Sequence, residues 1–354
     1  MKFRFALPDT LRVTQTLAAL CILFLISTAG FVAVREPAHA KQASKSQQAP
    51  EALPASGPES AAAKADKKIV HVGFYLNRLT EVSHKDGTLR IDAWFWFRWK
   101  DKDLKPFETF ELVNGEIEER QPTEVMDDEG FQYSSVRVRA KVFKSFDVEN
   151  YPFDNHTIPI ELEDSNSEFK LMEFEPDASS KLDPSVSVDG WNISLRGVRS
   201  EPHTYPTNYG FQSLGENNAT YSRFIVELGL DRHESLLTVV KLFWVSYLAL
   251  ILAIGACFVK SSDIDARFGI GLGSIFAASA NTIAVSAELP DTPVITLAEQ
   301  INIVTVLVIF MTIFLSIISL RLRHNGREYT AEVLDFSCAG LLSVGYIVAL
   351  LVIF

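Results

Sequence analysis

The polar and aromatic side chains of this sequence are suited to forming ion pairs, packing aromatic rings and attracting ions. They are not arranged for making or breaking covalent bonds. The segment YPFD places Tyr151, Pro152 and Phe153 directly before Asp154. The proline restricts the turn, the rings offer apolar contact, and the carboxylate can pair with a cation. A simple turn into the following strand, with a packed ring and a capping aspartate, would use the same residues. The histidines between residues 71 and 233 show no metal-ligand spacing, and no nucleophile elbow or phosphate loop precedes a helix, so an enzyme is not favoured.

Apolar residues make up 47% of the 354 residues and are concentrated in blocks. The first block, at 17–34, follows a basic N-terminus and precedes PAHA, which has the small residues of a cleavage site. We predict a signal peptide over 1–40. An uncleaved signal anchor is the alternative, because the block reaches the lower length limit of a membrane span. Residues 41–68 are rich in Ala, Ser, Gln and Pro without an apolar period, which predicts a disordered linker.

Charge argues against a nucleic-acid-binding protein, and cysteine content argues against a disulfide-stabilised one. The net charge of −11 disfavours nucleic-acid binding. Its acidic runs, MDDEG and IELED, either attract cations to a vestibule or form an ordinary solvated surface. Cys21, Cys257 and Cys338 each lie in an apolar segment, so the exported portion has no cysteine pair that could form a disulfide framework.

Residues 69–235 show the pattern of short alternating strands. The strands are separated by the turn clusters HKDG, DDEG, LDPS and GENN, and no helix-length amphipathic run interrupts them. This segment therefore predicts an exported all-β sandwich of immunoglobulin-like type with about ten strands.

The clearest strand, LRIDAWFWFRWK at 89–100, has two contrasting faces. Alternation places Leu89, Phe95 and Trp99 on a core face together with the other residues of that phase. The opposite face carries Trp94 and Trp96 among charged residues, where a monomer normally shows only polar groups. Cross-strand packing with long arginine side chains accounts for these tryptophans as well as a subunit interface or a ligand site does.

Four apolar segments, at about 236–259, 268–287, 294–320 and 336–354, are each long enough for a helical membrane span. Basic residues cluster at one set of span ends and acidic residues at the other. The positive-inside rule then places both the β domain and the C-terminus outside. The predicted architecture is a β-sandwich followed by an all-α transmembrane domain of four helices.

An exported β-sandwich joined directly to four spans resembles the pentameric ligand-gated ion channels, the Cys-loop receptor family. The resemblance covers about residues 70–354 and rests on motifs that occur in the family's order. VGFYLNRLTEVSHKDGTLRIDAWFWFRWKD is similar to the first hairpin, and YPFD is similar to the Phe-Pro-Phe-Asp signature. GWNI fits a later strand, and ELPDTPVITLAEQ resembles the loop between the second and third helices of the bacterial proton-gated members.

The resemblance implies that YPFD couples the base of the sandwich to that loop. Arg232, just before the first span, is the expected partner of Asp154. The residues assigned to coupling are Tyr151, Pro152, Phe153, Asp154, Arg232, Leu289, Pro290 and Pro293. The sequence also departs from the family. The cysteines that bracket this loop in animal receptors are absent, as in bacterial relatives, and the first span carries Lys241 and lacks the usual proline.

The resemblance aligns DARFGIGLGSIFAASANTIAVSAELP with the pore-lining second helix of the family. This segment is the least apolar of the four spans, and its polar residues are costly against lipid but acceptable beside water. At helical spacing one stripe holds Asp265, Gly269, Gly273, Phe276, Ala280 and Ala287, with Ile283 or Ala284 completing it. The pore candidates are Asp265, Gly269, Gly273, Phe276, Ala280 and Ile283. A ring of Asp265 would favour cations and a ring of Phe276 would gate the pore. The alternatives are an ordinary acidic helix start and close helix packing at the two glycines.

For the ligand, the resemblance implies a site between subunits, under a hairpin loop at 201–219 and against a strand of the neighbour. The candidate residues for stacking on an apolar or cationic ligand are Trp94, Trp96, Tyr205, Tyr209 and Phe211. An animal-type amine cage is not supported, because the sequence has no Trp-x-Pro segment at the corresponding place.

The expected function is a ligand- or proton-gated, cation-selective ion channel that works as a homopentamer. Its expected location is a bacterial inner membrane, with the sandwich in the periplasm. The expected partners are lipid, permeant cations and an unidentified small ligand or protons, with no cofactor. The alternative is a non-conducting membrane receptor or accessory subunit whose spans only assemble.

Overall fold

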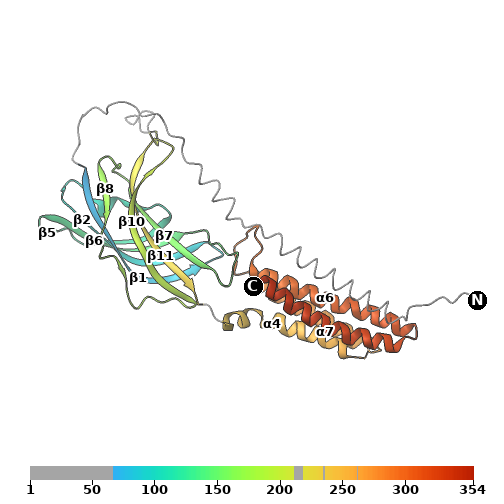
Figure 1. Cartoon of the computed structure of the whole chain (residues 1–354). Helices are drawn as coiled ribbons and strands as arrows, with labels where there is room; N and C mark the ends of the chain where they lie inside the picture. Colours follow the sequence, from blue (N-terminus) through green and yellow to red (C-terminus); the bar gives the residue numbers. More distant parts are fainter. Residues whose placement is uncertain (1–66, 211–217, 234–235, 261) are drawn as a thin grey trace, which may run out of the picture. The chain divides into compact units, whose positions relative to one another are not determined.

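The computed structural model describes residues 67–210, 218–233, 236–260 and 262–354 (Figure 1). The predicted signal peptide or anchor and nearly all of the predicted linker lie outside these residues. The chain divides into two compact units close to residue 235, and we call them the β unit and the helical unit.

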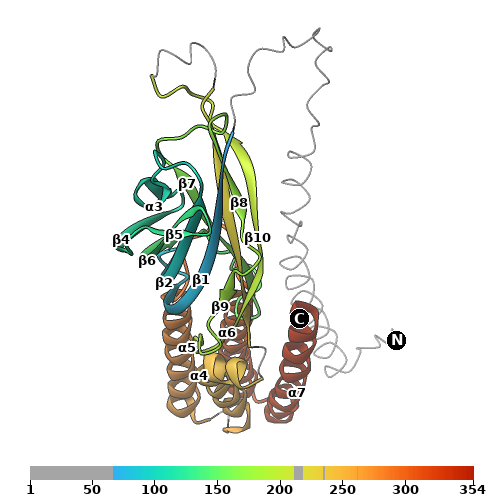
Figure 2. The ribbon, with the colours of Figure 1, turned by 90° about the vertical axis from the view of Figure 1, so that its left-hand side faces the viewer.

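The β unit consists of two sheets (Figures 1 and 2). The strands of the first sheet are β1 (Lys68–Ser83), β2 (Thr88–Trp99), β4 (Gly115–Pro122), β5 (Met126–Asp128), β6 (Phe131–Phe143), β8 (Met172–Pro176) and β9 (Lys181–Leu182). Their order is β4-β6-β2-β1-β8, with β5 paired to β6 and β9 paired to β1. All pairs are antiparallel except those of β1 with β8 and β9, which are parallel.

The second sheet has the order β10-β11-β7-β3. Its strands are β3 (Phe110–Leu112), β7 (Asn155–Asp164), β10 (Trp191–Thr204) and β11 (Thr220–Arg232), and a short helix, α3 (Pro106–Thr109), precedes β3. The two sheets confirm the prediction of an all-β sandwich.

The core of the β unit is formed by the apolar side chains that point to one face of each strand. Leu89, Phe95 and Trp99 of β2 are at most 2% exposed, as their alternation predicts. The second sheet contributes Ile160 of β7 and Leu228 of β11, both fully buried. Strands whose apolar side chains alternate with polar ones can bury only one face, so two sheets pack face to face.

The other face of β2 is partly covered by the same chain. Trp96 is half-buried, and its indole N–H donates to Asp177 Oδ2 at 2.8 Å. Its register partner on β1 is Gly73, where a Cβ atom would lie 2.0 Å from the indole ring. The position therefore requires glycine, and it favours packing within one chain as the explanation for Trp96. Trp94 is also half-buried, between the register positions of Tyr75 and Arg137.

Among the described residues, the helical unit has four helices that are long and apolar enough to cross a membrane, so the chain is a multi-pass membrane protein. They are α4 (Leu236–Gly255), continued by the 3₁₀ turn η2 (Ala256–Phe258), α5 (Ile264–Ser286), α6 (Leu297–His324) and α7 (Glu328–Ile353). In this bundle α6 packs against α4, α5 and α7 (Figures 1 and 2).

Helix ends differ from the predicted spans because polar residues extend the helices beyond their apolar segments. α7 begins at Glu328 instead of 336, and α6 continues to His324 through Arg321 and Arg323, which suit the negative end of a helix dipole. α6 begins later than predicted, at Leu297, because Thr296 and Glu299 form a reciprocal capping box.

Candidate functional site

The YPFD segment ends at a buried ion pair. Asp154 lies directly before β7, its side chain is 1% exposed, and Arg232 ends β11. The antiparallel register of β7 and β11 pairs Asn155 with Asp231, which brings the neighbouring positions 154 and 232 together. Arg232 Nε donates to Asp154 Oδ1 at 2.8 Å, and Arg232 Nη2 lies 3.3 Å from Oδ2. The predicted partner of Asp154 is therefore the observed one.

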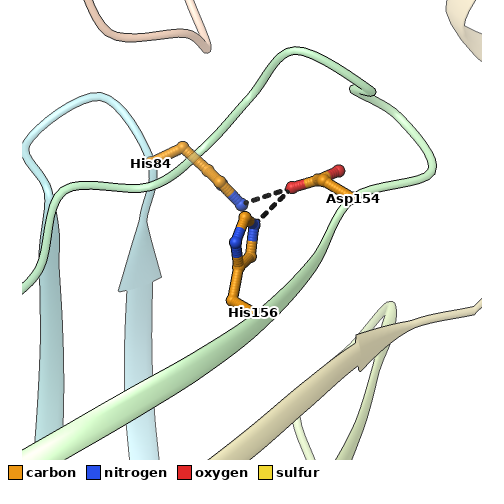
Figure 3. A group of neighbouring side chains, drawn as sticks. All are labelled: His84, Asp154 and His156. Carbon is orange, nitrogen blue, oxygen red and sulfur yellow. Dashed lines mark hydrogen bonds and ion pairs between the residues drawn. The ribbon is translucent and has the colours of Figure 1, made fainter. Parts of the chain in front are cut away.

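Two histidines that the sequence analysis did not place here converge on the same carboxylate (Figure 3). His156 Nε2 lies 2.6 Å and His84 Nε2 lies 3.4 Å from Asp154 Oδ2. His156 is the second residue of β7, and His84 lies in the turn between β1 and β2. We call Asp154, His84, His156 and Arg232 the Asp154 cluster. The Asp-x-His spacing could have indicated His156, since residues two apart on an extended chain point the same way.

Aromatic rings enclose the Asp154 cluster, and they are Phe146, Tyr151 and Trp191. Trp191 stacks on His84 with ring centroids 5.5 Å apart and planes at 22°. The guanidinium carbon of Arg232 lies 4.2 Å from the centroid of Trp191 and 5.1 Å from that of Tyr151. These rings limit solvent around the charges and hold the guanidinium by cation–π attraction.

The charge state of Asp154 follows from two opposing effects. Burial raises the pKa of Asp154, but the contacts with His156, His84 and Arg232, together with the charge of Arg232, outweigh burial and hold this pKa far below its usual range. The carboxylate is therefore ionised at any physiological pH and can accept hydrogen bonds but not donate them.

The cluster has a donor set that a metal ion could use. The two histidine nitrogens and one carboxylate oxygen lie within 4.8 Å of one another, and zinc accepts such ligands. Arg232, however, already pairs with Asp154, and its Nη2 lies 3.1 Å from His84 Nε2. A divalent ion would have to displace this contact and would face a fixed positive charge. The guanidinium of Arg232 thus occupies the place that a metal cation would take in this cluster.

The candidate ligand residues Tyr205 and Tyr209 follow β10, and Tyr205 belongs to a polar network that the sequence analysis missed. The Tyr205 hydroxyl donates to Glu163 at 3.0 Å and accepts from Arg223 at 2.9 Å. Arg223 also bonds Glu161. Burial and the bond to Glu163 raise the pKa of Tyr205 to about 12. Tyr209 packs edge-on to Tyr205 at 5.6 Å and is otherwise exposed.

Trp94 and Trp96 lie on β2 of the first sheet, whereas Tyr205 and Tyr209 follow β10 of the second. Phe211 lies outside the described residues. The predicted site that would combine them across two subunits stays a prediction.

The pore candidates lie together on α5. Asp265, Gly269, Gly273, Phe276, Ala280 and Ile283 are all exposed in the single chain. The opposite face packs inside the unit: a Cβ at Gly271 would lie 2.6 Å from Ile313, whereas a Cβ at Gly269 or Gly273 would meet nothing within 4 Å. The close helix packing considered for Gly269 and Gly273 therefore occurs, within this chain, at Gly271.

Asp265 lies in the first turn of α5, and the neighbouring basic residue points elsewhere. Arg267 is 3% exposed and bonds Asp335 of α7 through Nη1 and Nη2 at 3.0 and 2.5 Å. Its Nε donates to the carbonyl oxygen of Val259 at 2.7 Å.

Leu289, Pro290 and Pro293 lie in the loop between α5 and α6. Their predicted contact with YPFD stays a prediction. A search against models of protein families found no match to this chain, and a search of curated proteins found no significant relative.

Proposed function

We propose that this chain is one subunit of a homopentameric ion channel, opened by a small ligand or by protons, with α5 lining the pore. The proposal includes an immunoglobulin-like type for the sandwich, a bacterial inner membrane as the location and the periplasm as the side of the β unit. It follows the resemblance of the sequence to the pentameric ligand-gated ion channels. The observation that carries it is the uncovered face of α5.

The exposed faces of the helices differ in composition. The exposed residues of α4 and α7 are mostly large and apolar, including Trp244, Ile251, Phe336 and Leu351, which suits contact with lipid tails. The exposed row of α5 instead combines a carboxylate with glycines and alanines and only isolated large residues. Acidic groups are costly against lipid. A closed ring of subunits that turns α5 inward gives this row water and leaves the apolar faces to the membrane.

Cation selectivity follows from the charges at the start of α5. Asp265 is exposed, so a ring of five would place five carboxylates at one mouth of the pore, where they attract cations and repel anions. The only basic side chain within two residues of it, Arg267, is buried and neutralised by Asp335. Permeant cations are therefore the partners that this mouth favours.

Phe276 is the proposed gate. Its side chain is 73% exposed in the single chain and lies between Gly273 and Ala280 along the row. Because small residues lie on both sides of Phe276 along the row, a ring of five phenyl groups would form the narrowest apolar section of such a pore. Narrow apolar sections exclude water. Ile283, at 71% exposure, is the next large residue along the row.

Single-channel recording from the purified full-length protein in planar bilayers tests the proposal, across pH and a panel of small apolar and cationic ligands. The expected result is unitary cation currents, with native mass spectrometry in detergent showing pentamers. The Phe276→Ser variant should leak at rest, and Phe336→Ser, on the exposed apolar face of α7, is its matched control. Monomers without currents under any condition would instead favour a non-conducting receptor.

A further inference from the structure

Two groups compete for one nitrogen of the Asp154 cluster. Arg232 Nη2 lies 3.1 Å from His84 Nε2, and Asp154 Oδ2 lies 3.4 Å from the same atom (Figure 3). A guanidinium has only donors, and an ionised carboxylate has only acceptors. His84 Nε2 therefore cannot satisfy both neighbours at once, because a ring nitrogen either carries a proton and donates or offers a lone pair and accepts.

The state of His84 decides which neighbour it can bond. A neutral ring with its proton on Nδ1 accepts from Arg232, and the shorter of the two contacts fits this state. A doubly protonated ring can donate from Nε2 to Asp154 but turns an N–H, and a positive charge, toward Arg232. The two bonding patterns exclude each other.

His156 does not have this property. Its Nε2 lies 2.6 Å from Asp154 Oδ2 and donates to that carboxylate whether the ring is neutral or charged. A second proton on His156 therefore changes the charge of the cluster but not its pattern of bonds. Of the two histidines, His84 is the one whose protonation forces a rearrangement.

Burial makes the protonated state of His84 unfavourable unless the bonds of the cluster rearrange. The side chains of His84, Asp154 and Arg232 are 11%, 1% and 13% exposed, so water screens their charges poorly. The ionisable side chains that contact His84 among the described residues are Asp154, His156, Arg232 and Tyr151. Asp154 is the only anion among them. With His84 neutral, Asp154 and Arg232 balance, whereas protonation leaves two adjacent cations to share one carboxylate.

We propose that His84 is a proton-operated switch in the β unit, which on protonation takes Asp154 as its partner and releases Arg232 from the His84 side of the cluster. Arg232 is the last residue of β11, and the first membrane helix begins at Leu236. The switch itself concerns only the β unit, and its effect on ion flow rests on the proposed channel function.

The test measures amide hydrogen exchange of the full-length protein in detergent, at about pH 8 and at about pH 5.5, after correction for intrinsic rates. We expect wild-type peptides from the end of β11 to exchange about tenfold faster at the lower pH. His84→Gln keeps a hydrogen-bonding group without a titration and should abolish this difference. His84→Phe keeps the ring contacts with Phe146 and Trp191 and serves as the second variant should His84→Gln fold poorly.

His71→Gln is the matched control, because His71 lies within β1, the strand that precedes His84, but away from the cluster, and it should retain the wild-type response. A wild-type protein with no pH difference, or a His84→Gln variant with the full difference, would overturn the switch. So would protection of β11 by micromolar zinc at about pH 8 that requires both His84 and His156, since the cluster would then be a metal site.

Recording from the same variants separates the two proposals. Loss of the exchange response in His84→Gln with no currents from any protein supports the switch and rejects the channel. Currents whose activation by acid is unchanged in His84→Gln, together with an unchanged exchange response, reject the switch and support the channel.

Discussion

A buried arginine–aspartate pair occurs in each unit of this protein, and the two pairs have different neighbours. In the helical unit, Arg267 bonds Asp335 through two nitrogens and the Val259 carbonyl through a third. In the β unit, Arg232 shares Asp154 with two histidines. The bonds that Arg267 makes within the described residues are to a carboxylate and to backbone carbonyl oxygens. Arg232 lies beside a histidine ring.

The difference shows how the same ion pair can serve as a clamp or as a switch. Arg267 joins α5 to α7, and every donor contact it makes is with a carboxylate or a carbonyl oxygen. Arg232 has a neighbour that can either accept from it or repel it, so the β unit has two patterns of bonds available.

The largest expected effect is on stability, when the Arg267 clamp is broken. Arg267→Met leaves Asp335 buried without its partner, which should cost about 3–5 kcal/mol. Thermal unfolding of the full-length protein in detergent measures this loss. Arg321→Gln, an exposed arginine near the end of α6, should change stability by less than about 0.5 kcal/mol. The double variant Arg267→Met/Asp335→Leu should recover most of the loss, and a neutral single variant would show that the pair is no clamp.

The corresponding change in the β unit should cost less. Asp154→Asn keeps one acceptor for Arg232 but removes the negative charge, and we expect a loss of about 2–3 kcal/mol with impaired gating. Denaturant unfolding of the full-length protein measures the stability, and bilayer recording measures the gating. Asp231→Asn is the matched control, because its partner Arg196 is exposed and such pairs contribute about 0–1 kcal/mol. Equal losses for the two variants would contradict the burial argument.

The acid dependence of that loss sharpens the comparison. The folded pKa of Asp154 is depressed, so its contribution to stability is fully present above the unfolded value of about 4 and is lost as pH falls below it. The free-energy difference between wild type and Asp154→Asn should therefore shrink as pH falls below about 4. A difference that does not shrink in that range would contradict the depressed pKa of Asp154.

The smallest expected effect on stability comes from an aspartate that is exposed. Asp265→Asn should change the unfolding free energy by less than about 0.5 kcal/mol. It should nevertheless lower cation conductance and weaken discrimination against chloride, because the field at the pore mouth is removed. Reversal potentials under a salt gradient decide this. Asp263→Asn is the control, since Asp263 precedes the helix and lies two residues away. A shift with Asp263→Asn alone would show that the register of the pore row is wrong.

Patterns with a fixed backbone period could be predicted from the sequence. The alternation in 89–100 placed Leu89, Phe95 and Trp99 in the core, because successive side chains of a strand point to opposite faces. The 3.6-residue period of a helix likewise placed Asp265 and Phe276 on one exposed row of α5. The four apolar segments are likewise four long helices, because the length and apolar composition of a segment are local properties of the sequence. The ends of these helices differ from the predicted ends, because caps and charged residues decide where a helix stops.

Contacts between distant elements depended on register and packing, which no local period encodes. Arg267 and Asp335 are 68 residues apart, so the sequence showed a basic residue beside the proposed cation mouth without showing what neutralises it. Gly271 contacts Ile313 only because α5 packs on α6 at that height. The Asp154 cluster requires the β7–β11 register and a turn far earlier in the chain. Asp154 and Arg232 were predicted as a pair, but only the tertiary structure placed His84 where one proton decides between them.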